Sequence, residues 1–195
     1  MPKTKDAFDA MREQTRQKIE AAALSLFARK GLSVTVGEIA RAAGVSHGLM
    51  YSHHPSKDAL VTELVQQAMT TSSEAILAFA ESKDTVAEKI QKISHMMCQM
   101  FSEAPMGIDY FMFMVQVGLS GFQMPETPSP NPVESLAHII VQGQAESVVV
   151  QGDPVQLSLI YWAAIQGLCC YAITGVPILP DATALNRILL KENIT

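Results

Sequence analysis

Cysteine, aromatic residues and charge are all scarce in this chain of 195 residues. Its three cysteines are too few for a disulfide framework and odd in number, and no basic, apolar leader opens the sequence, so we expect a cytoplasmic protein. Charged residues make up 17% of the chain and hydrophobic residues 48%, which indicates a folded globular protein and excludes a disordered one.

Sequence motifs of catalysis and cofactor binding are missing as well. The chain has no GxSxG, P-loop or GxGxxG motif and no pair of carboxylates at a defined spacing. We therefore expect no enzyme, no cofactor and no metal site. Cys98, Cys169 and Cys170 lack a CxxC pair, so we interpret them as structural residues, with a soft-metal or thiol-redox sensor as the alternative.

Basic residues are concentrated near the N-terminus of a chain whose formal net charge is −5. Residues 1–60 carry nine Lys or Arg against six Asp or Glu, which leaves +3, whereas the remainder carries five against thirteen, which leaves −8. We call residues 1–60 the head and the remainder the body. A basic head beside an acidic body indicates that the head is the part that binds a polyanion such as DNA.

Twenty residues beginning at Thr35 have the signals of two short helices joined by a turn. Thr35 followed by Glu38 predicts a capping box, in which each side chain binds a backbone amide beside the other. Gly44 ends the first helix, because only glycine adopts left-handed backbone angles without strain. Ser46 caps the second helix, and Pro55 excludes the α conformation from the residue before it. Alone, this stretch fits either an αα-corner or a helix-turn-helix.

Helical spacing of apolar residues continues along the chain, and no segment has the pattern of a strand. After an arm of residues 1–11, the spacing and the capping residues predict helices over 12–30, 56–79, 84–101 (capped by Asp84), from Pro105, over 133–150 and 153–174, and after Asp181. Residues 120–132 hold four of the ten prolines and predict a loop. The sequence thus predicts an all-α fold, with an N-terminal three-helix domain followed by a larger helical domain.

Residues 16–60 resemble the N-terminal domain of the tetracycline-repressor-like (TetR/AcrR) family of bacterial transcriptional regulators. The matching residues are Ile19, Ala22, Ala23, Leu26, Phe27, Gly31, Thr35, Ile39, Ala40, Ala43, Gly44, Val45, Ser46, Gly48, Tyr51, His53, Ser56, Lys57 and Leu60. The resemblance implies a DNA-binding domain of residues 1–55 and a ligand-binding and dimerisation domain of residues 56–195. His54 stands where the family usually has Phe, and a histidine there would loosen the packing of the second short helix or make it sensitive to pH.

The resemblance also implies which residues bind DNA. The segment from Ser46 to His54 would lie in the major groove, with His47 at the base edges and Gly48 allowing a close approach of the backbone. The residues that would contact phosphates or attract them are Thr35, Arg41, Tyr51, His53 and Lys57.

The body is rich in methionine and aromatic side chains. Each of these alone is better explained as core, but the set favours an adaptable pocket for an apolar or aromatic small molecule. The residues predicted to line the pocket or orient its ligand are His95, Met96, Met100, Tyr110, Phe111, Met114, His138, Tyr161, Trp162 and Gln166.

Residues 157–176 carry no charge and are long enough to span a bilayer. Polar residues interrupt this segment and no Lys or Arg flanks it, so we expect no membrane association. The resemblance implies instead a homodimer, in which the helices near 133–150 and 153–174 form a four-helix interface with the same pair of a second subunit.

The sequence and the resemblance together predict a homodimeric bacterial repressor. It would bind a pseudo-palindromic operator in double-stranded DNA and be released by a small apolar or aromatic effector. The alternatives are the cysteine-based sensor and a helical ligand-binding protein that does not bind DNA.

Overall fold

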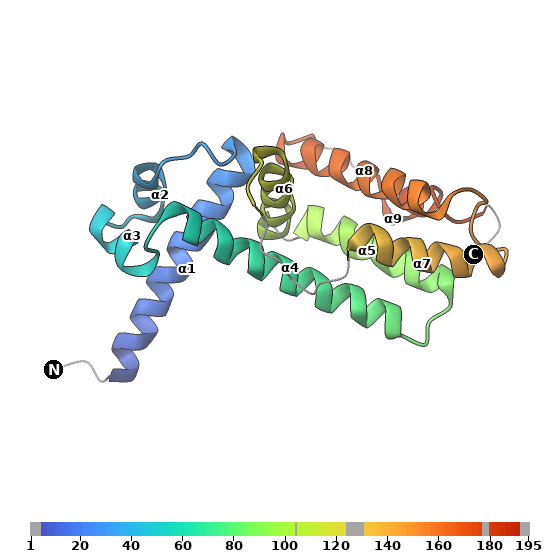
Figure 1. Ribbon diagram of the computed structural model, residues 1–195, viewed down its shortest axis with the longest axis horizontal. Coiled ribbons are helices and arrows are strands. Elements are labelled where there is room, and N and C mark those ends of the chain that lie inside the picture. Colours follow the sequence, from blue (N-terminus) through green and yellow to red (C-terminus); the bar gives the residue numbers. More distant parts are fainter. Residues whose placement is uncertain (1–4, 104, 124–130, 177–179, 192–195) are drawn as a thin grey trace. The chain divides into compact units, whose positions relative to one another are not determined.

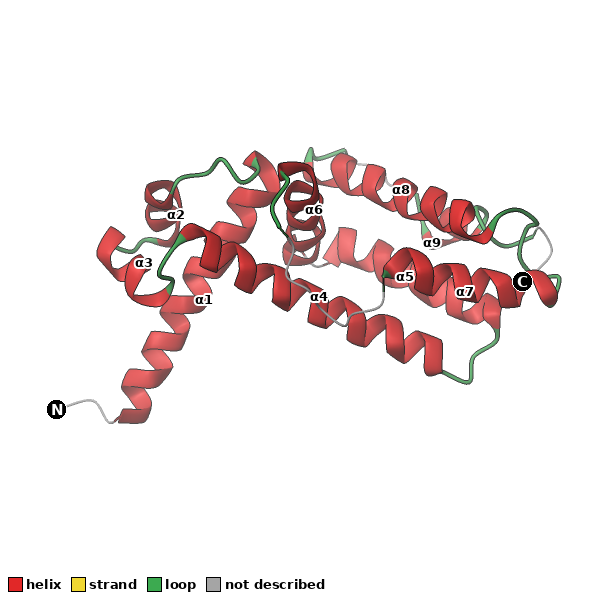
Figure 2. Ribbon diagram, in the orientation of Figure 1, coloured by secondary structure: helices red, strands yellow, loops and turns green. Residues whose placement is uncertain are grey.

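The computed structural model describes residues 5–103, 105–123, 131–176 and 180–191, and these form nine helices (Figure 1). In chain order they are α1 (Lys5–Lys30), α2 (Val36–Ala43), α3 (His47–His53), α4 (Lys57–Glu81), α5 (Val86–Glu103), α6 (Pro105–Ser120), α7 (Pro132–Ala145), α8 (Pro154–Ile173) and α9 (Ala182–Asn186). Figure 2 shows the same chain without a strand, and within the described ranges the β-type pairing is one isolated bridge between Val149 and Leu190. The predicted all-α fold is confirmed.

Packing divides the chain into two compact units. The first comprises Met1–Ala68 and Asp109–Glu126, and the second comprises Met69–Ile108 and Thr127–Thr195. The division follows packing, whereas the predicted boundary after residue 55 follows function. That boundary therefore stays a prediction.

The first unit has a core built from α1, α2, α3, α4 and α6. Phe27 of α1 stacks on Phe113 of α6 with ring centroids 5.8 Å apart, and both side chains are fully buried. Each such side chain contributes about 1.5–3 kcal/mol when it leaves water. The same core buries Ile19, Leu24, Ile39, Met50, Leu60 and Leu64. The two short helices are thereby fixed on a packed support.

The second unit packs α5 against α7, α8 and α9. The hydroxyl groups of Tyr161 and Ser94 are 2.7 Å apart in its interior, so the one buried polar group satisfies the other. Ser158 of α8 donates to the carbonyl of Val133 over 2.8 Å and ties α8 to α7. Gly143 of α7 lets Val149 and Val86 pack against the helix backbone, since a Cβ at this position would collide with both valine side chains.

Two predicted helix starts were wrong. The arm of residues 1–11 is helical from Lys5, because Asp6 lies in the favourable first turn and no apolar face is needed on an exposed helix. The cap of α5 is Thr85 rather than Asp84: Thr85 Oγ1 accepts from the amide of Glu88 over 3.3 Å, and the Thr85 amide donates to Glu88 over 2.7 Å. Asp84 instead pairs with Lys92 at 2.6 Å.

The helix predicted over 133–150 ends earlier, at Ala145. Its apolar periodicity continues, but Ser147 takes a left-handed φ of 63° and turns the chain. The Val150 amide then donates to Leu189 over 2.9 Å, and the Lys191 amide donates to Val148 over 3.1 Å. A pairing with residues 40 positions away on the chain ends this helix, and a local pattern does not reveal it. The predicted loop over 120–132 falls mostly outside the described residues.

Candidate nucleic-acid interface

Local capping fixes both ends of α2 as the sequence predicted. The Glu38 amide donates to Thr35 Oγ1 over 3.3 Å, and the Thr35 amide donates to Glu38 Oε2 over 2.9 Å, which completes the capping box. These bonds lower the pKa of Glu38, so its carboxylate is held in the charged form. Gly44 has φ of 68°, and the next amide, that of Val45, donates back to Ala40 over 3.0 Å. The turn between the two helices therefore has a single, well-supported conformation.

Helix α3 has one buried face and one open face. Ser46 Oγ accepts from the Leu49 amide over 3.1 Å and starts the helix. Met50 on the inner face is 1% exposed, whereas Tyr51 is 45% exposed. His47, one turn before Tyr51, lies edge-on to its ring with centroids 5.1 Å apart. The outer face thus presents an imidazole and a phenol to solvent.

Gly48 lies on this open face, and its environment explains little about why glycine is there. A Cβ at Gly48 would meet no atom within 4 Å, and the residue has no left-handed φ. Neither packing nor backbone conformation within the chain requires a glycine. Because Gly48 has no side chain, the helix backbone is uncovered at this point, and another molecule's backbone can lie close to it.

Among the residues predicted to contact or attract phosphates, Tyr51 and His53 belong to α3 itself, and Thr35 and Lys57 also bind within the chain. Lys57 Nζ donates to the carbonyl of Leu32 over 2.7 Å, and an ammonium group has two further donors. Thr35 Oγ1 lies 2.9 Å from Glu38 Oε2. Arg41 is exposed. The side chains of Thr35 and Lys57 are therefore held in place before any partner arrives.

His53 at the end of α3 is half-buried. Partial burial, together with the positive charge of Arg12, lowers its pKa. The lowered pKa favours the uncharged imidazole of His53, which can donate one hydrogen bond but carries no positive charge.

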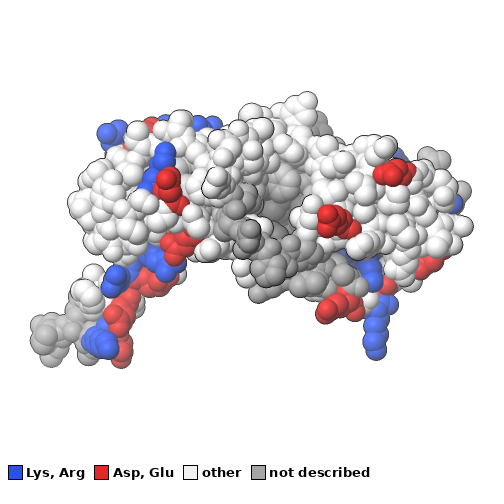
Figure 3. Space-filling model, viewed as in Figure 1, with Lys and Arg blue, Asp and Glu red and all other residues white. Residues whose placement is uncertain are grey.

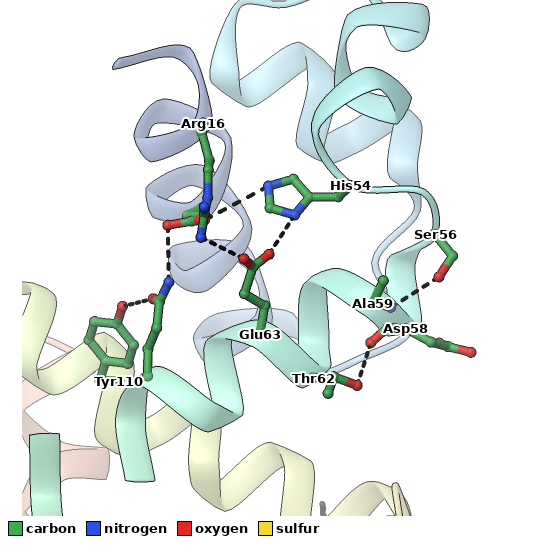
Figure 4. Close-up of polar contacts among 10 residues, drawn as sticks. Arg16, His54, Ser56, Asp58, Ala59, Thr62, Glu63 and Tyr110 are labelled. Atoms are coloured by element: carbon green, nitrogen blue, oxygen red, sulfur yellow. Dashed lines mark hydrogen bonds and ion pairs between the residues drawn. The ribbon is translucent and has the colours of Figure 1, made fainter. Parts of the chain in front are cut away.

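His54, the C-cap of α3, is enclosed by charged side chains of α1 and α4 (Figure 4). The residue is 1% exposed, and its Nδ1 lies 3.0 Å from Glu63 Oε2. Its Nε2 lies 3.9 Å from Glu20 Oε1, too far for a hydrogen bond, and has no hydrogen-bond partner. Arg16 binds both carboxylates: Nε donates to Glu20 over 2.7 Å and Nη2 donates to Glu63. We call Arg16, Glu20, His54 and Glu63 the His54 cluster.

Hydrogen bonds continue from this cluster to α6. Gln67 of α4 donates to Glu20 Oε2 over 3.4 Å and accepts from the Tyr110 hydroxyl over 3.0 Å. Tyr110 was predicted to orient a ligand, and in the structure its hydroxyl is engaged within the first unit. Sequence reasoning missed the cluster. The visible signal was a histidine at a position where the resemblance leads one to expect Phe, but its partners lie far away in the chain.

The residues predicted to bind a ligand do not lie in a single environment. Tyr110, Phe111 and Met114 belong to the first unit and the others to the second. Burial raises the pKa of Tyr161 to about 12, although its hydrogen bond with Ser94 acts in the opposite direction. Trp162 Nε1 donates to the carbonyl of Pro132 over 3.2 Å. Met96 and Met100 are half-buried, and His95, His138 and Gln166 are exposed.

The cysteines lie in three different environments. Cys169 is buried, which raises its pKa to about 12, and Cys170 beside it is exposed. Burial also raises the pKa of Cys98. Within the described ranges none of the three joins a cluster of metal-ligating side chains. A raised pKa makes the thiols of Cys98 and Cys169 poor nucleophiles and poor ligands, which favours the structural interpretation for these two residues over the cysteine-based sensor.

Comparison with known proteins finds a family match within the N-terminal part of the chain. Residues 19–64 match the model of a family described as bacterial regulatory proteins, tetR family. The HTH-type transcriptional regulator AcrR of Shigella flexneri is 47% identical over 53 residues, which are 27% of this chain and only 25% of that relative's length.

Solved structures share the fold over nearly the whole chain. A γ-butyrolactone receptor described as ArpA-like matches with a TM-score of 0.68 and 20% identity, over 90% of this chain and 98% of that one. NalD, described as the secondary repressor of the MexAB-OprM multidrug efflux pump in Pseudomonas aeruginosa, matches with a TM-score of 0.60 and 21% identity, over 92% and 98%. At these identities the likeness shows the fold.

Proposed function

We propose that this chain is a ligand-responsive transcriptional regulator, a repressor that binds a pseudo-palindromic DNA operator as a homodimer in the bacterial cytoplasm. The observation that carries the proposal is the open face of α3. His47 and Tyr51 are exposed on it around a glycine that nothing in the chain requires, while Met50 anchors the opposite face. The matched family consists of regulatory proteins, so we propose no catalytic activity.

On DNA, α3 would enter the major groove from its open face. His47 would contact base edges, and Gly48 would let the helix approach closely. Thr35, Arg41, Tyr51, His53 and Lys57 would contact or attract phosphates on either side. Ser46 would act through its cap, which keeps the first turn of α3 formed.

Dimerisation would use α7 and α8. Helix α8 carries no charged residue, and the visible upper surface of the second unit in Figure 3 is mostly uncharged, with a few acidic groups. By length and composition α8 is the one described helix that could cross a membrane, yet only 22% of its apolar window is buried within the chain. Its exposed apolar side chains, with one on α7, are Val155, Leu159, Ile160, Tyr171 and Val141. A second subunit would cover this surface and set two α3 helices one DNA turn apart.

The effector would be a small apolar or aromatic molecule bound in the body, near the methionine and aromatic residues named above. Its binding would move α4 and change the separation of the two α3 helices. For this to release DNA, the effector must bind the free protein more tightly than the DNA-bound protein. A titration that gives the same effector affinity with and without operator would contradict this mechanism.

Selection of bound duplexes from a random DNA pool tests the function. We expect a motif with two inverted half-sites centred about one helical turn apart. Binding should weaken steeply between about 50 and 200 mM salt, because phosphate contacts release counterions. A pool that yields no motif, with no salt-dependent binding to any duplex, would instead support a helical ligand-binding protein.

A further inference from the structure

The His54 cluster holds a buried imidazole between two carboxylates, which is an unusual environment for a helix cap. Glu20, His54 and Glu63 each offer one ligand atom, and these atoms lie within 4.8 Å of one another. His54 is 1% exposed, and its Nε2 has no hydrogen-bond partner within the chain. Leaving such a group without a partner costs about 1–3 kcal/mol, so its orientation needs an explanation.

We propose that Glu20, His54 and Glu63 form a binding site for a divalent transition-metal ion such as Zn²⁺, which replaces the guanidinium of Arg16. The sequence did not predict this site, and nothing in the expected action on DNA requires it.

The distances favour an ion at Nε2. In tetrahedral coordination, with ligand bonds of about 2.0–2.2 Å, two ligand atoms of one Zn²⁺ ion lie about 3.4 Å apart. His54 Nε2 and Glu20 Oε1 are 3.9 Å apart, which is too long for a hydrogen bond and about half an ångström wider than this span. A small rotation of the Glu20 side chain would close the difference.

The other imidazole nitrogen is already in the arrangement that metal-binding histidines show. His54 Nδ1 lies 3.0 Å from Glu63 Oε2, so a proton on Nδ1 leaves the lone pair on Nε2. A carboxylate on the far nitrogen fixes the tautomer and the ring orientation and makes the ligand more basic. The carboxylate of Glu63 would stay at Nδ1 and orient the imidazole, while Glu20 binds the ion at Nε2.

Charge favours the exchange of a guanidinium for an ion. With a neutral imidazole the cluster has two carboxylates against one cation, Arg16, which leaves a net charge of −1. A divalent ion in place of Arg16 would bring that charge to zero. Imidazole with carboxylate is a ligand set that suits Zn²⁺ and its neighbours.

The side chain of Arg16 can also move away from the two carboxylates. Its side chain is 36% exposed and that of Glu63 is 35% exposed, so the cluster opens to solvent on this side. Arg16 lines a surface depression together with Asp9, Arg12, Glu13 and His53, where Glu13 offers another carboxylate. An ion would enter as the guanidinium turns toward that depression.

Titration of the full-length chain with Zn²⁺, followed by calorimetry and by thermal unfolding, tests the site without DNA. We expect one ion per chain and a higher unfolding temperature, because a ligand that binds only the folded state stabilises it. His54→Phe should weaken binding by more than about 100-fold, since even the groups that only orient metal ligands are worth about 10- to 100-fold. Glu20→Gln should weaken it as well, and provides a second variant if His54→Phe does not fold.

Two further variants separate this site from adventitious binding. Arg16→Met should tighten Zn²⁺ binding, because it removes the competing cation, and a surface site elsewhere would not respond. His53→Phe, the matched change one residue away, should leave binding unchanged. Titration with Co²⁺ should give an absorption spectrum without thiolate charge-transfer bands. Saturable binding that survives His54→Phe, an unchanged affinity in Arg16→Met, or thiolate bands would each overturn the proposal.

These measurements test the metal site independently of DNA binding. Its effect on regulation rests on the proposed function, since the ion would join the end of α3 to α1 and α4. In that case Zn²⁺ should change operator affinity in the wild type but not in His54→Phe.

Discussion

Helices α3 and α8 both leave a face uncovered by their own chain, but the two faces differ in kind. On α3 the open face is short, exposes His47, Gly48 and Tyr51, and follows a basic N-terminal segment. On α8 it runs along an uncharged helix and exposes large apolar side chains such as Leu159 and Ile160. A polar face suits a hydrated polyanion, whereas an apolar face is stable only when another apolar surface covers it. The contrast fits the two partners that we propose, DNA for α3 and a second subunit for α8.

The largest effect is expected at α8. Ile160→Glu would place a charge in the proposed dimer interface, and burying an unpaired charge costs several kcal/mol. The dimer dissociation constant should therefore rise by at least about 100-fold, as measured by analytical ultracentrifugation. Phe8→Glu makes the same kind of change on the exposed part of α1 and should leave the dimer intact. A dimer that tolerates Ile160→Glu would mean that the apolar face of α8 has another purpose.

The next largest effect is a difference in stability between substitutions on the buried and the open face of α3. Met50→Ala should lower the free energy of unfolding by about 2–5 kcal/mol, because it leaves a cavity beneath the helix. His47→Ala, on the open face, should change it by less than about 0.5 kcal/mol. Chemical denaturation of both variants measures the difference. Equal losses would show that the outer face of α3 is also part of the core.

Gly48→Ala should make stability and DNA binding change in opposite directions. Alanine is a better helix former than glycine by about 0.5–1 kcal/mol, and its methyl group meets no atom of the chain. The variant should therefore unfold at a slightly higher temperature but bind operator more weakly in fluorescence anisotropy. Gly118→Ala on α6, where the added methyl group also meets nothing, should leave operator affinity unchanged. Unimpaired binding by Gly48→Ala would remove the argument for close approach.

The smallest effect concerns the capping boxes, which occur in both units. Hydrogen bonds from Thr35 lower the pKa of Glu38, and those from Thr85 lower the pKa of Glu88. Such a group contributes stability that is fully present above the unfolded pKa, about 4.3, and is lost as the pH falls through the lower folded value. Unfolding curves between pH 6 and pH 3 should therefore show a smaller acid loss for Glu38→Gln and Glu88→Gln than for the wild type. Identical pH dependence in all three proteins would contradict the assignment.

The ends of the helices show what the sequence could and could not predict. Ser46, Gly44 and Thr35 act through bonds to residues at most four positions away, so their sequence pattern was sufficient. The end of α7 at Ala145 depends on pairing between the segment after it and residues near Leu190, which no local pattern shows. The start of α1 at Lys5 was missed for a different reason, since an exposed helix needs no apolar stripe.

The charged part of the site was the least predictable. Arg16 and Glu63 lie 47 positions apart, as do Glu20 and Gln67, so only the folded chain brings them around His54. The resemblance located the histidine as a departure from the expected Phe but gave no indication of its partners. Residue roles on the open face of α3 and in the body stay predictions.

Base preference at each position of the selected operator, measured for the wild type, His47→Ala and Lys57→Ala, tests the central claim most directly. We predict that His47→Ala relaxes the preference at one position in each half-site, by about 1–3 kcal/mol of discrimination. Lys57→Ala should weaken all sequences alike and reduce the slope of log affinity against log salt by about 1. Two variants with the same profile, or a wild type without base preference at any position, would contradict the assignment of the outer face of α3 to the major groove.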